Sequence, residues 1–202
     1  DGIFVLPGSF TFTTAKDTLT AGDLSYDLSP VTYNGGTQPL AVTGSADVGA
    51  VTVKYDGDTA APKTPGTYAI AADVAESAKY KAVTALSLGD YTISKKDVTI
   101  TGVAAADREF AAGDKTVALD FSGASVDGKI GSDAVVPSGG AGTMADDSVG
   151  TNKPVTVTGV TLSGAGAGNY SLTAQPAGVT VNILAIPVVD ASISPFERSY
   201  DL

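Results

Sequence analysis

Apolar and polar residues alternate along much of the chain. Val51, Val53 and Tyr55 share one parity and are separated by polar residues. A period of two is typical of strands that bury one face and expose the other. No segment shows the i, i+3, i+4, i+7 apolar spacing of an amphipathic helix. The pattern therefore predicts an all-β chain. The same alternation recurs at Tyr68–Val74 and at Val179–Ile183.

Two of the predicted strands change phase at a glycine. The apolar positions of Val98–Val103 shift by one residue at Gly102, and those of Val155–Leu162 shift at Gly159. A phase change at glycine predicts a β-bulge or a strand that passes from one sheet to another. Because both breaks have the sequence Thr-Gly-Val, we expect paired or symmetry-related strands there.

Turn signals separate the strands at intervals of roughly ten residues, which is the rhythm of a β-sandwich rather than a βαβ fold. Asn-Gly and Asp-Gly supply the positive φ angles that tight hairpins need. The predicted turns are Tyr33–Gly36, Tyr55–Asp58, Thr64–Gly66, Val126–Gly128 and Ser138–Gly140.

A short charged segment, Ser94–Asp97, lies between two strand-rich halves. We therefore predict two tandem Ig-like β-sandwich modules with a short linker. The modules cover residues 1–95 and 96–185, and residues 186–202 form an extended exit segment.

The amino-acid composition favours a strand-rich fold and limits the catalytic and metal sites that the chain can form. The chain has 24 Gly, 24 Thr and 22 Val but 12 Leu and three Glu, and branched residues favour strands. It lacks His and Cys, so the usual catalytic triads, cysteine nucleophiles and common zinc ligand sets are excluded. A net charge of −10 disfavours nucleic acid and anionic membrane surfaces as partners. No apolar run reaches the ~18 residues of a membrane span, so we expect no membrane insertion.

The remaining candidate chemistry rests on carboxylates. Most of the aspartates lie in predicted turns, where Asp accepts hydrogen bonds from backbone amides. A glycosidase needs two carboxylates across a cleft, and a pair such as Glu109 and Asp120 remains open. The glycine-rich Gly164–Gly168 lies between strands without a following helix, so a turn explains it better than a phosphate site. We expect no enzyme activity.

Calcium is a better candidate than any reaction. Asp56, Asp58, Asp146 and Asp147 place pairs of carboxylates in predicted loops, and Ca²⁺ takes six to eight oxygen ligands. The sequence contains no EF-hand or nonapeptide calcium motif. We therefore treat these four aspartates as a hypothetical calcium site and expect no other cofactor.

The tyrosines and one Lys–Asn pair are further candidates for binding or cross-linking sites. Most tyrosines lie at apolar parity in strands and are expected in the core, whereas Tyr33 and Tyr80 lie near turns and are expected to be exposed. Lys96 and Asn182 are candidate partners for an isopeptide cross-link, although a solvent-facing Asn182 is the simpler expectation.

The first half resembles the bacterial MBG repeat, a mostly β and glycine-rich family. The resemblance covers residues 24–95. The matching elements are Val31–Gly35, Ala50–Tyr55, Pro65–Ile70 and Asp90–Ser94.

The second half, residues 97–184, resembles the YDG repeat of large bacterial surface proteins. The family's Tyr-Asp-Gly is replaced here by Phe110-Ala-Ala-Gly113. The matching elements are Val98–Val103, Thr116–Phe121, Val149–Lys153, Val155–Ser163 and Ala167–Leu172.

These resemblances imply a structural stalk or spacer in an extracellular, cell-surface or secreted adhesin-like protein, with neighbouring modules of one long chain as its partners. The alternative is an adhesion module that itself binds a glycan or host protein. Flanking segments fit a longer array: Phe4–Leu6 and Phe10–Phe12 are predicted strands, and Ser199–Leu202 repeats Ser25–Leu28. We expect another module to begin at this repeat.

Overall fold

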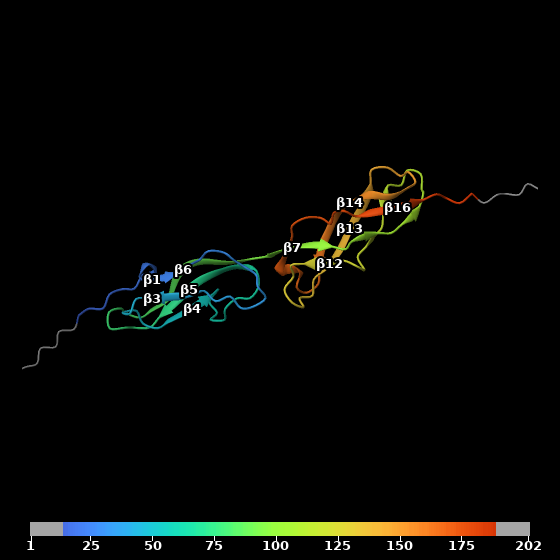
Figure 1. The fold of residues 1–202 in the computed structure, drawn as a ribbon. Helices are drawn as coiled ribbons and strands as arrows, with labels where there is room; N and C mark the ends of the chain where they lie inside the picture. Colours follow the sequence, from blue (N-terminus) through green and yellow to red (C-terminus); the bar gives the residue numbers. More distant parts are fainter. Residues whose placement is uncertain (1–13, 189–202) are drawn as a thin grey trace, which may run out of the picture. The chain divides into compact units, whose positions relative to one another are not determined.

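The computed structural model describes residues 14–188 (Figure 1). The strands predicted at Phe4–Leu6 and Phe10–Phe12, and the repeat expected at Ser199–Leu202, lie outside the described residues. The chain divides into two compact units, unit 1 (Asp1–Lys96) and unit 2 (Asp97–Leu202). The described residues form strands and two three-residue 3₁₀ helices, so the all-β prediction is confirmed. None of the helices in this described part is long and apolar enough to cross a membrane.

Unit 1 is built around a four-stranded sheet with the order β2-β6-β5-β4, and β1 pairs separately with β3. β6 is antiparallel to β5 but parallel to the short strand β2. The elements are η1 (Ala21–Asp23), β1 (Leu24–Tyr26), β2 (Val31–Thr32), β3 (Val42–Gly44), β4 (Val51–Tyr55), β5 (Gly66–Val74) and β6 (Val83–Ser94).

Alternate residues of these strands build the core of unit 1, because successive side chains point to opposite faces. The predicted parity of β5 is confirmed, with Ile70, Ala72 and Val74 all buried. Four tyrosines join the aliphatic residues in this core: Tyr33, Tyr55, Tyr80 and Tyr91.

Unit 2 contains three sheets with the orders β10-β13-β14-β16-β9, β12-β7-β15 and β8-β11. β13, β14 and β16 are antiparallel neighbours, whereas β16 and β9 are parallel. Its elements are β7 (Lys96–Thr101), β8 (Ala104–Ala105), β9 (Arg108–Glu109), β10 (Thr116–Val117), β11 (Leu119–Asp120), β12 (Ser125–Asp127), β13 (Val136–Met144), β14 (Gly150–Ser163), η2 (Ala167–Asn169), β15 (Tyr170–Leu172) and β16 (Thr180–Leu184).

The core of unit 2 is mainly valine. Branched side chains suit this unit because its long strands present pleated, half-buried faces. The predicted burial of Val179, Val181 and Ile183 is confirmed; the last two lie on β16 and Val179 directly precedes it. The other buried residues include Val98, Ile100, Val117, Val126, Val135, Met144, Val155, Val157, Val160 and Tyr170.

Both predicted phase changes occur, by two different routes. Gly102 has a φ of 72° and follows β7, after which the chain enters a different sheet at β8. Gly159 has a φ of 71° inside β14 and lies opposite Gly140 of β13, whose φ is 92°. The two Thr-Gly-Val breaks are therefore not paired with one another. Gly102 instead approaches the carbonyl oxygen of Gly123, where a Cβ would come within 2.4 Å.

The predicted turns show one clear error. Asp56 and Gly57 have φ angles of 50° and 91° and form the expected tight turn. Ser138–Gly140, however, lies within β13 rather than at a reversal. Its glycines, Gly139 and Gly140, adopt positive φ while the pairing register with β14 stays unbroken, so the same local signal marks a phase change inside a paired strand rather than a turn.

Candidate functional site

The unit 1 members of the hypothetical calcium site hold the turn after β4. Asp56 Oδ1 accepts a hydrogen bond from the Ala69 amide at 2.9 Å, which ties the turn to β5. Asp58 Oδ1 accepts one from the Ala60 amide at 3.0 Å. Each carboxylate therefore satisfies a backbone donor of the turn, as aspartate commonly does.

The unit 2 members bind two different loops. Asp146 accepts hydrogen bonds from the Lys153 ammonium and from the Ser148 hydroxyl and amide. These bonds, that of Lys153 first, hold the pKa of its carboxyl well below the usual range. Asp147 Oδ2 accepts the Gly113 amide at 2.6 Å. It thereby anchors the segment Phe110–Gly113.

Among residues 14–188 no group of three or more His, Cys, Asp and Glu side chains is arranged to hold a metal ion. The Lys153 ammonium supplies the positive charge at Asp146. Calcium binding by these four aspartates stays a prediction, and these contacts give it no further support.

The two tyrosines expected at the surface are buried, so that prediction is wrong. Tyr33 is 3% exposed and Tyr80 is 7% exposed. Tyr33 directly follows β2, and its amide bonds to Ser94 O, which keeps the residue against the sheet. The Tyr80 hydroxyl donates to Asp23 Oδ1 at 3.2 Å. Proximity to a turn in sequence did not distinguish a strand end from an exposed loop.

Asn182 does not face solvent freely, contrary to expectation. Its backbone amide donates a hydrogen bond to Asp107 Oδ1 at 2.8 Å, and its side-chain Nδ2 donates one to Asp107 Oδ2 at 2.9 Å. Its Oδ1 accepts the Asn152 amide at 2.9 Å, where Asn152 has a φ of 52°. The side chain therefore connects three segments of unit 2. Because the side-chain amide of Asn182 is hydrogen-bonded to Asp107, the geometry gives no support to a cross-link between Asn182 and Lys96.

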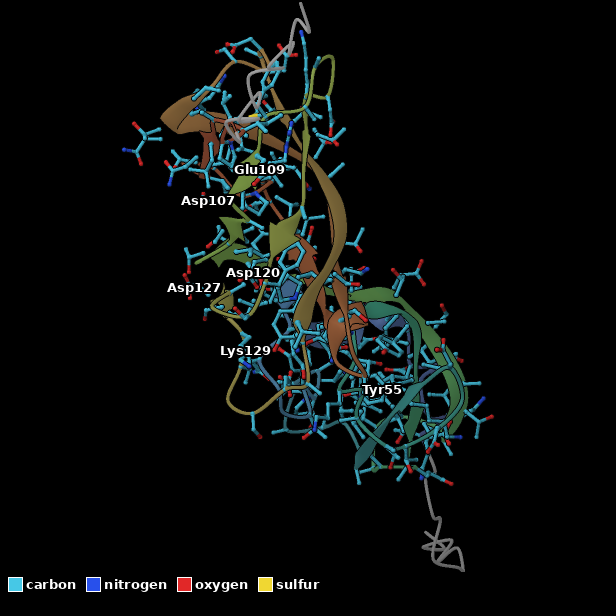
Figure 2. All side chains as sticks on the ribbon, turned by 90° about the vertical axis from the view of Figure 1, so that its right-hand side faces the viewer. Tyr55, Asp107, Glu109, Asp120, Asp127 and Lys129 are labelled. Carbon is cyan, nitrogen blue, oxygen red and sulfur yellow. The ribbon has the colours of Figure 1, made fainter. Side chains whose placement is uncertain are left out.

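The carboxylates considered for glycoside cleavage belong to different sheets. Glu109 lies on β9 at the edge of the five-stranded sheet, and Asp120 lies on β11, which pairs with β8. Figure 2 shows Glu109 beside Asp107 and apart from Asp120. Asp120 Oδ1 accepts the Ser122 amide at 2.8 Å, a turn-capping contact. This arrangement does not favour a catalytic pair.

A surface depression of about 290 Å³ lies beside β7 and β12. This volume is at the lower limit of ligand pockets, which hold roughly 300–1,000 Å³. The Asp127 carboxylate at its edge accepts bonds from Thr101 and Ser125 hydroxyls. The lining residues are Asp97, Val98, Thr99, Asp127, Gly128 and Thr173.

The placement of chain entry and exit was missed by the sequence reasoning. In unit 1 the chain enters beside the segment that precedes β6, because Asp17 bonds to Lys79 O at 2.8 Å and to the Lys81 amide at 3.0 Å. It leaves after Ser94, the last residue of β6. Entry and exit therefore lie at opposite ends of the longest strand of unit 1.

Unit 2 has the same property relative to β14. Entry at β7 is fixed by a bond from the Thr173 amide to Val98 O at 3.2 Å, and Gln175 bonds to the second half of β14. Near the exit, Ile183 pairs with Gly150, the first residue of β14. Within unit 2, Figure 1 shows β7 at one end and the exit after β16 at the other.

The comparison with known families gives one match, and it falls mainly in unit 2. Residues 94–177 match the model of the YDG domain. The matched range includes β7 through β15, and β16 lies beyond it. No curated protein and no solved structure gives a significant match.

Proposed function

We propose that the chain is a structural stalk or spacer segment of an extracellular, bacterial adhesin-like surface protein, and that its partners are neighbouring modules of the same polypeptide. The observation that carries this proposal is the position of entry and exit at opposite ends of the longest strand in each unit. A chain that crosses each module from end to end gains reach with every module.

Strand length sets the reach of one module. β6 has 12 residues and β14 has 14. At about 3.3 Å per residue, such strands span roughly 40 Å before curvature is considered. A module of about 90 residues in this arrangement extends the chain by that length, whereas entry and exit at the same end would add little.

Family and fold give this proposal its context. The YDG match supports a repeat-type module, and unit 1 is its MBG-like neighbour in this proposal. We assign each unit to an Ig-like β-sandwich because its strands carry one buried face each. The acidic balance of 22 Asp and Glu to 12 Lys and Arg suits a module that stays soluble outside the cell. In this proposal neither unit has a catalytic role.

The test is replacement within the polypeptide that carries the chain. A spacer is expected to be exchangeable for unrelated β-modules of equal end-to-end length with adhesion retained, whereas simple deletion lowers adhesion. A glycan- or host-protein-binding module would instead lose adhesion on replacement. Binding of the isolated chain to a glycan array or to host matrix proteins at micromolar affinity would contradict the spacer function.

A further inference from the structure

Within the described residues 14–188, the final strand of each unit occupies an interior position of its sheet. β6 lies between β5, to which it is antiparallel, and β2, to which it is parallel. β16 lies between β14, to which it is antiparallel, and β9, to which it is parallel. The parallel neighbour is in both cases a two-residue strand from the early part of the same unit.

These two parallel contacts have the same register in both units. Val31 and Thr32 pair with the last two residues of β6, and the Tyr33 amide donates to Ser94 O at 2.9 Å. Arg108 and Glu109 pair with the last two residues of β16. There too the next amide, that of Phe110, donates to the last carbonyl of the strand, at 2.8 Å.

We call these contacts the parallel clamps: β2 with β6 in unit 1, and β9 with β16 in unit 2. The clamp of unit 2 has a side-chain extension. Asp107, directly before β9, receives both the backbone amide and the Nδ2 of Asn182, which lies on β16. Figure 2 shows Asp107 and Glu109 at the end of unit 2 that the chain leaves.

We propose that the parallel clamps resist pulling force along the chain. The segment before each short strand leads back towards the entry of the unit, and the segment after the final strand leads to its exit. Tension therefore pulls two parallel, paired strands in opposite directions along a common axis. Their hydrogen bonds are then sheared together, whereas strands pulled from the same end would separate one bond at a time.

This inference deepens the proposed function and rests on it for its biological meaning, since a stalk on a cell surface is under tension. The mechanical resistance of the clamps can be measured whether or not the chain is a spacer. Loss of exchangeability would overturn the spacer function and leave the clamps in place. Low mechanical resistance would overturn the clamps and leave the spacer function in place.

The first experiment compares two pulling directions on unit 2 within the whole 202-residue chain. The chain contains no cysteine, so paired handles are introduced as Lys95→Cys with Ala185→Cys, or as Ala112→Cys with Ala185→Cys. The first pair pulls from entry to exit and shears β9 against β16. The second pair pulls both strands from the same end and unzips them. Because about three bonds yield together in shear, we expect roughly threefold higher unfolding force with the first pair.

The second experiment tests Asp107 directly under constant entry-to-exit force. Asp107→Ala removes two hydrogen bonds of the clamp and is expected to shorten the lifetime of unit 2 about tenfold, because forced unfolding follows the unfolding rate. Asp107→Asn keeps an acceptor for the Asn182 amide and should give an intermediate lifetime. The matched control is Asp120→Ala, which loses a turn-capping bond outside the clamp.

A circular dichroism melt first confirms that each variant is folded, and Asp107→Asn serves if Asp107→Ala is not. Equal forces in the two pulling directions would overturn the inference. So would lifetimes of the Asp107 variants that equal those of the Asp120 control.

Discussion

Units 1 and 2 hold their final strands in the same way but fill their cores differently. Among residues 14–188, unit 1 buries four tyrosines, whereas unit 2 buries mainly valines and a single tyrosine, Tyr170. The parallel clamps nevertheless have the same register. The backbone arrangement of the final strand is therefore compatible with two kinds of core.

The difference has a physical consequence at the loops. A buried tyrosine needs a partner for its hydroxyl. The Tyr55 hydroxyl accepts the Leu40 amide at 2.7 Å and so holds the loop between β2 and β3. Tyr170 does the same for the Ile130 amide at 2.9 Å. Unit 1 depends more on such aromatic anchors, and unit 2 depends more on its long β13–β14 ladder.

The largest effects are expected from Ile93→Ala and Ile183→Ala, which change the first clamp position of each final strand. Both side chains are 1% exposed. Truncation of a buried isoleucine lowers the free energy of unfolding by about 2–5 kcal/mol. In urea titrations followed by tyrosine fluorescence, Ile93→Ala should move the main transition, because six of the eight tyrosines lie in unit 1.

Ile183→Ala should instead move a transition seen by circular dichroism with little change in tyrosine fluorescence. Leu184→Ala is the control, since Leu184 is 52% exposed and its truncation should cost less than about 0.5 kcal/mol. Equal shifts of both transitions by either isoleucine variant would show that the units do not unfold separately.

Next in size are Tyr55→Phe and Tyr170→Phe, which test the loop anchors. Each removes an acceptor from a backbone amide, and an unsatisfied buried donor costs about 1–3 kcal/mol. Tyr170→Phe also loses the bond to Asp133 Oδ2 at 2.6 Å, so its cost should be the larger. The urea midpoint of each variant, compared with that of the unaltered chain, measures its loss of stability.

Tyr68→Phe provides the comparison for these anchors. The Tyr68 hydroxyl donates to Thr64 O at an exposed position, where water replaces the lost bond. If Tyr68→Phe lowered the free energy of unfolding as much as Tyr55→Phe, burial would not explain the effect of the anchors.

Strand parity allowed the all-β class to be predicted, because each strand buries one face. The buried positions of β5 and β16 followed from the same pattern. Parity is a local property, however, and it does not state which strands pair. The parallel neighbours of β6 and β16 come from more than 60 positions earlier in the chain, so no local signal indicated the clamps.

The errors have a similar cause. Ser138–Gly140 has the composition of a turn, but it lies opposite Val160 and Thr161 of β14 in a ladder that only the tertiary fold creates. Tyr33 and Tyr80 lie near turns, yet both side chains point into the core. Asn182 differs again: its role depends on Asp107, 75 residues away. Its position on an apolar strand was the one available signal.

A smaller effect, of opposite sign in the two units, is expected at the two glutamines. Gln38 is 9% exposed and its Nε2 has no hydrogen-bond partner among the described residues. Gln38→Leu should therefore stabilise unit 1 by about 1 kcal/mol. Gln175 is the matched residue in unit 2: its Oε1 accepts the Val160 amide at 2.7 Å and its Nε2 donates to Val160 O at 3.0 Å.

Gln175→Leu should accordingly destabilise unit 2 by about 1 kcal/mol, because both backbone groups of Val160 lose their partner. The two variants are measured by urea unfolding as above. A loss of stability in Gln38→Leu would mean that its amide has a favourable role in the loop.

The smallest effect is expected from acid. Hydrogen bonds from the amide and side chain of Asn182 hold the pKa of Asp107 below its ordinary value of 3.8. In unit 1, hydrogen bonds from Lys54 and the Ala85 amide lower the pKa of Asp73 in the same way. A carboxylate with a depressed folded pKa stabilises the fold above its unfolded pKa, and that contribution is lost as the pH falls through the folded value. Both units should therefore weaken between about pH 4 and pH 2.

Replacing one carboxylate separates the units. Asp107→Asn should reduce the acid sensitivity of unit 2 alone, and Asp73→Asn should reduce that of unit 1 alone, in urea midpoints compared at about pH 6 and about pH 3. Asp73 is half-buried and still reached by solvent, so added salt should shrink its effect, which includes an ion pair with Lys54. The Asp107 effect rests on hydrogen bonds to a neutral asparagine and should persist in salt. If salt abolished both effects equally, general charge repulsion rather than the Asp107–Asn182 contact would account for the acid sensitivity of unit 2.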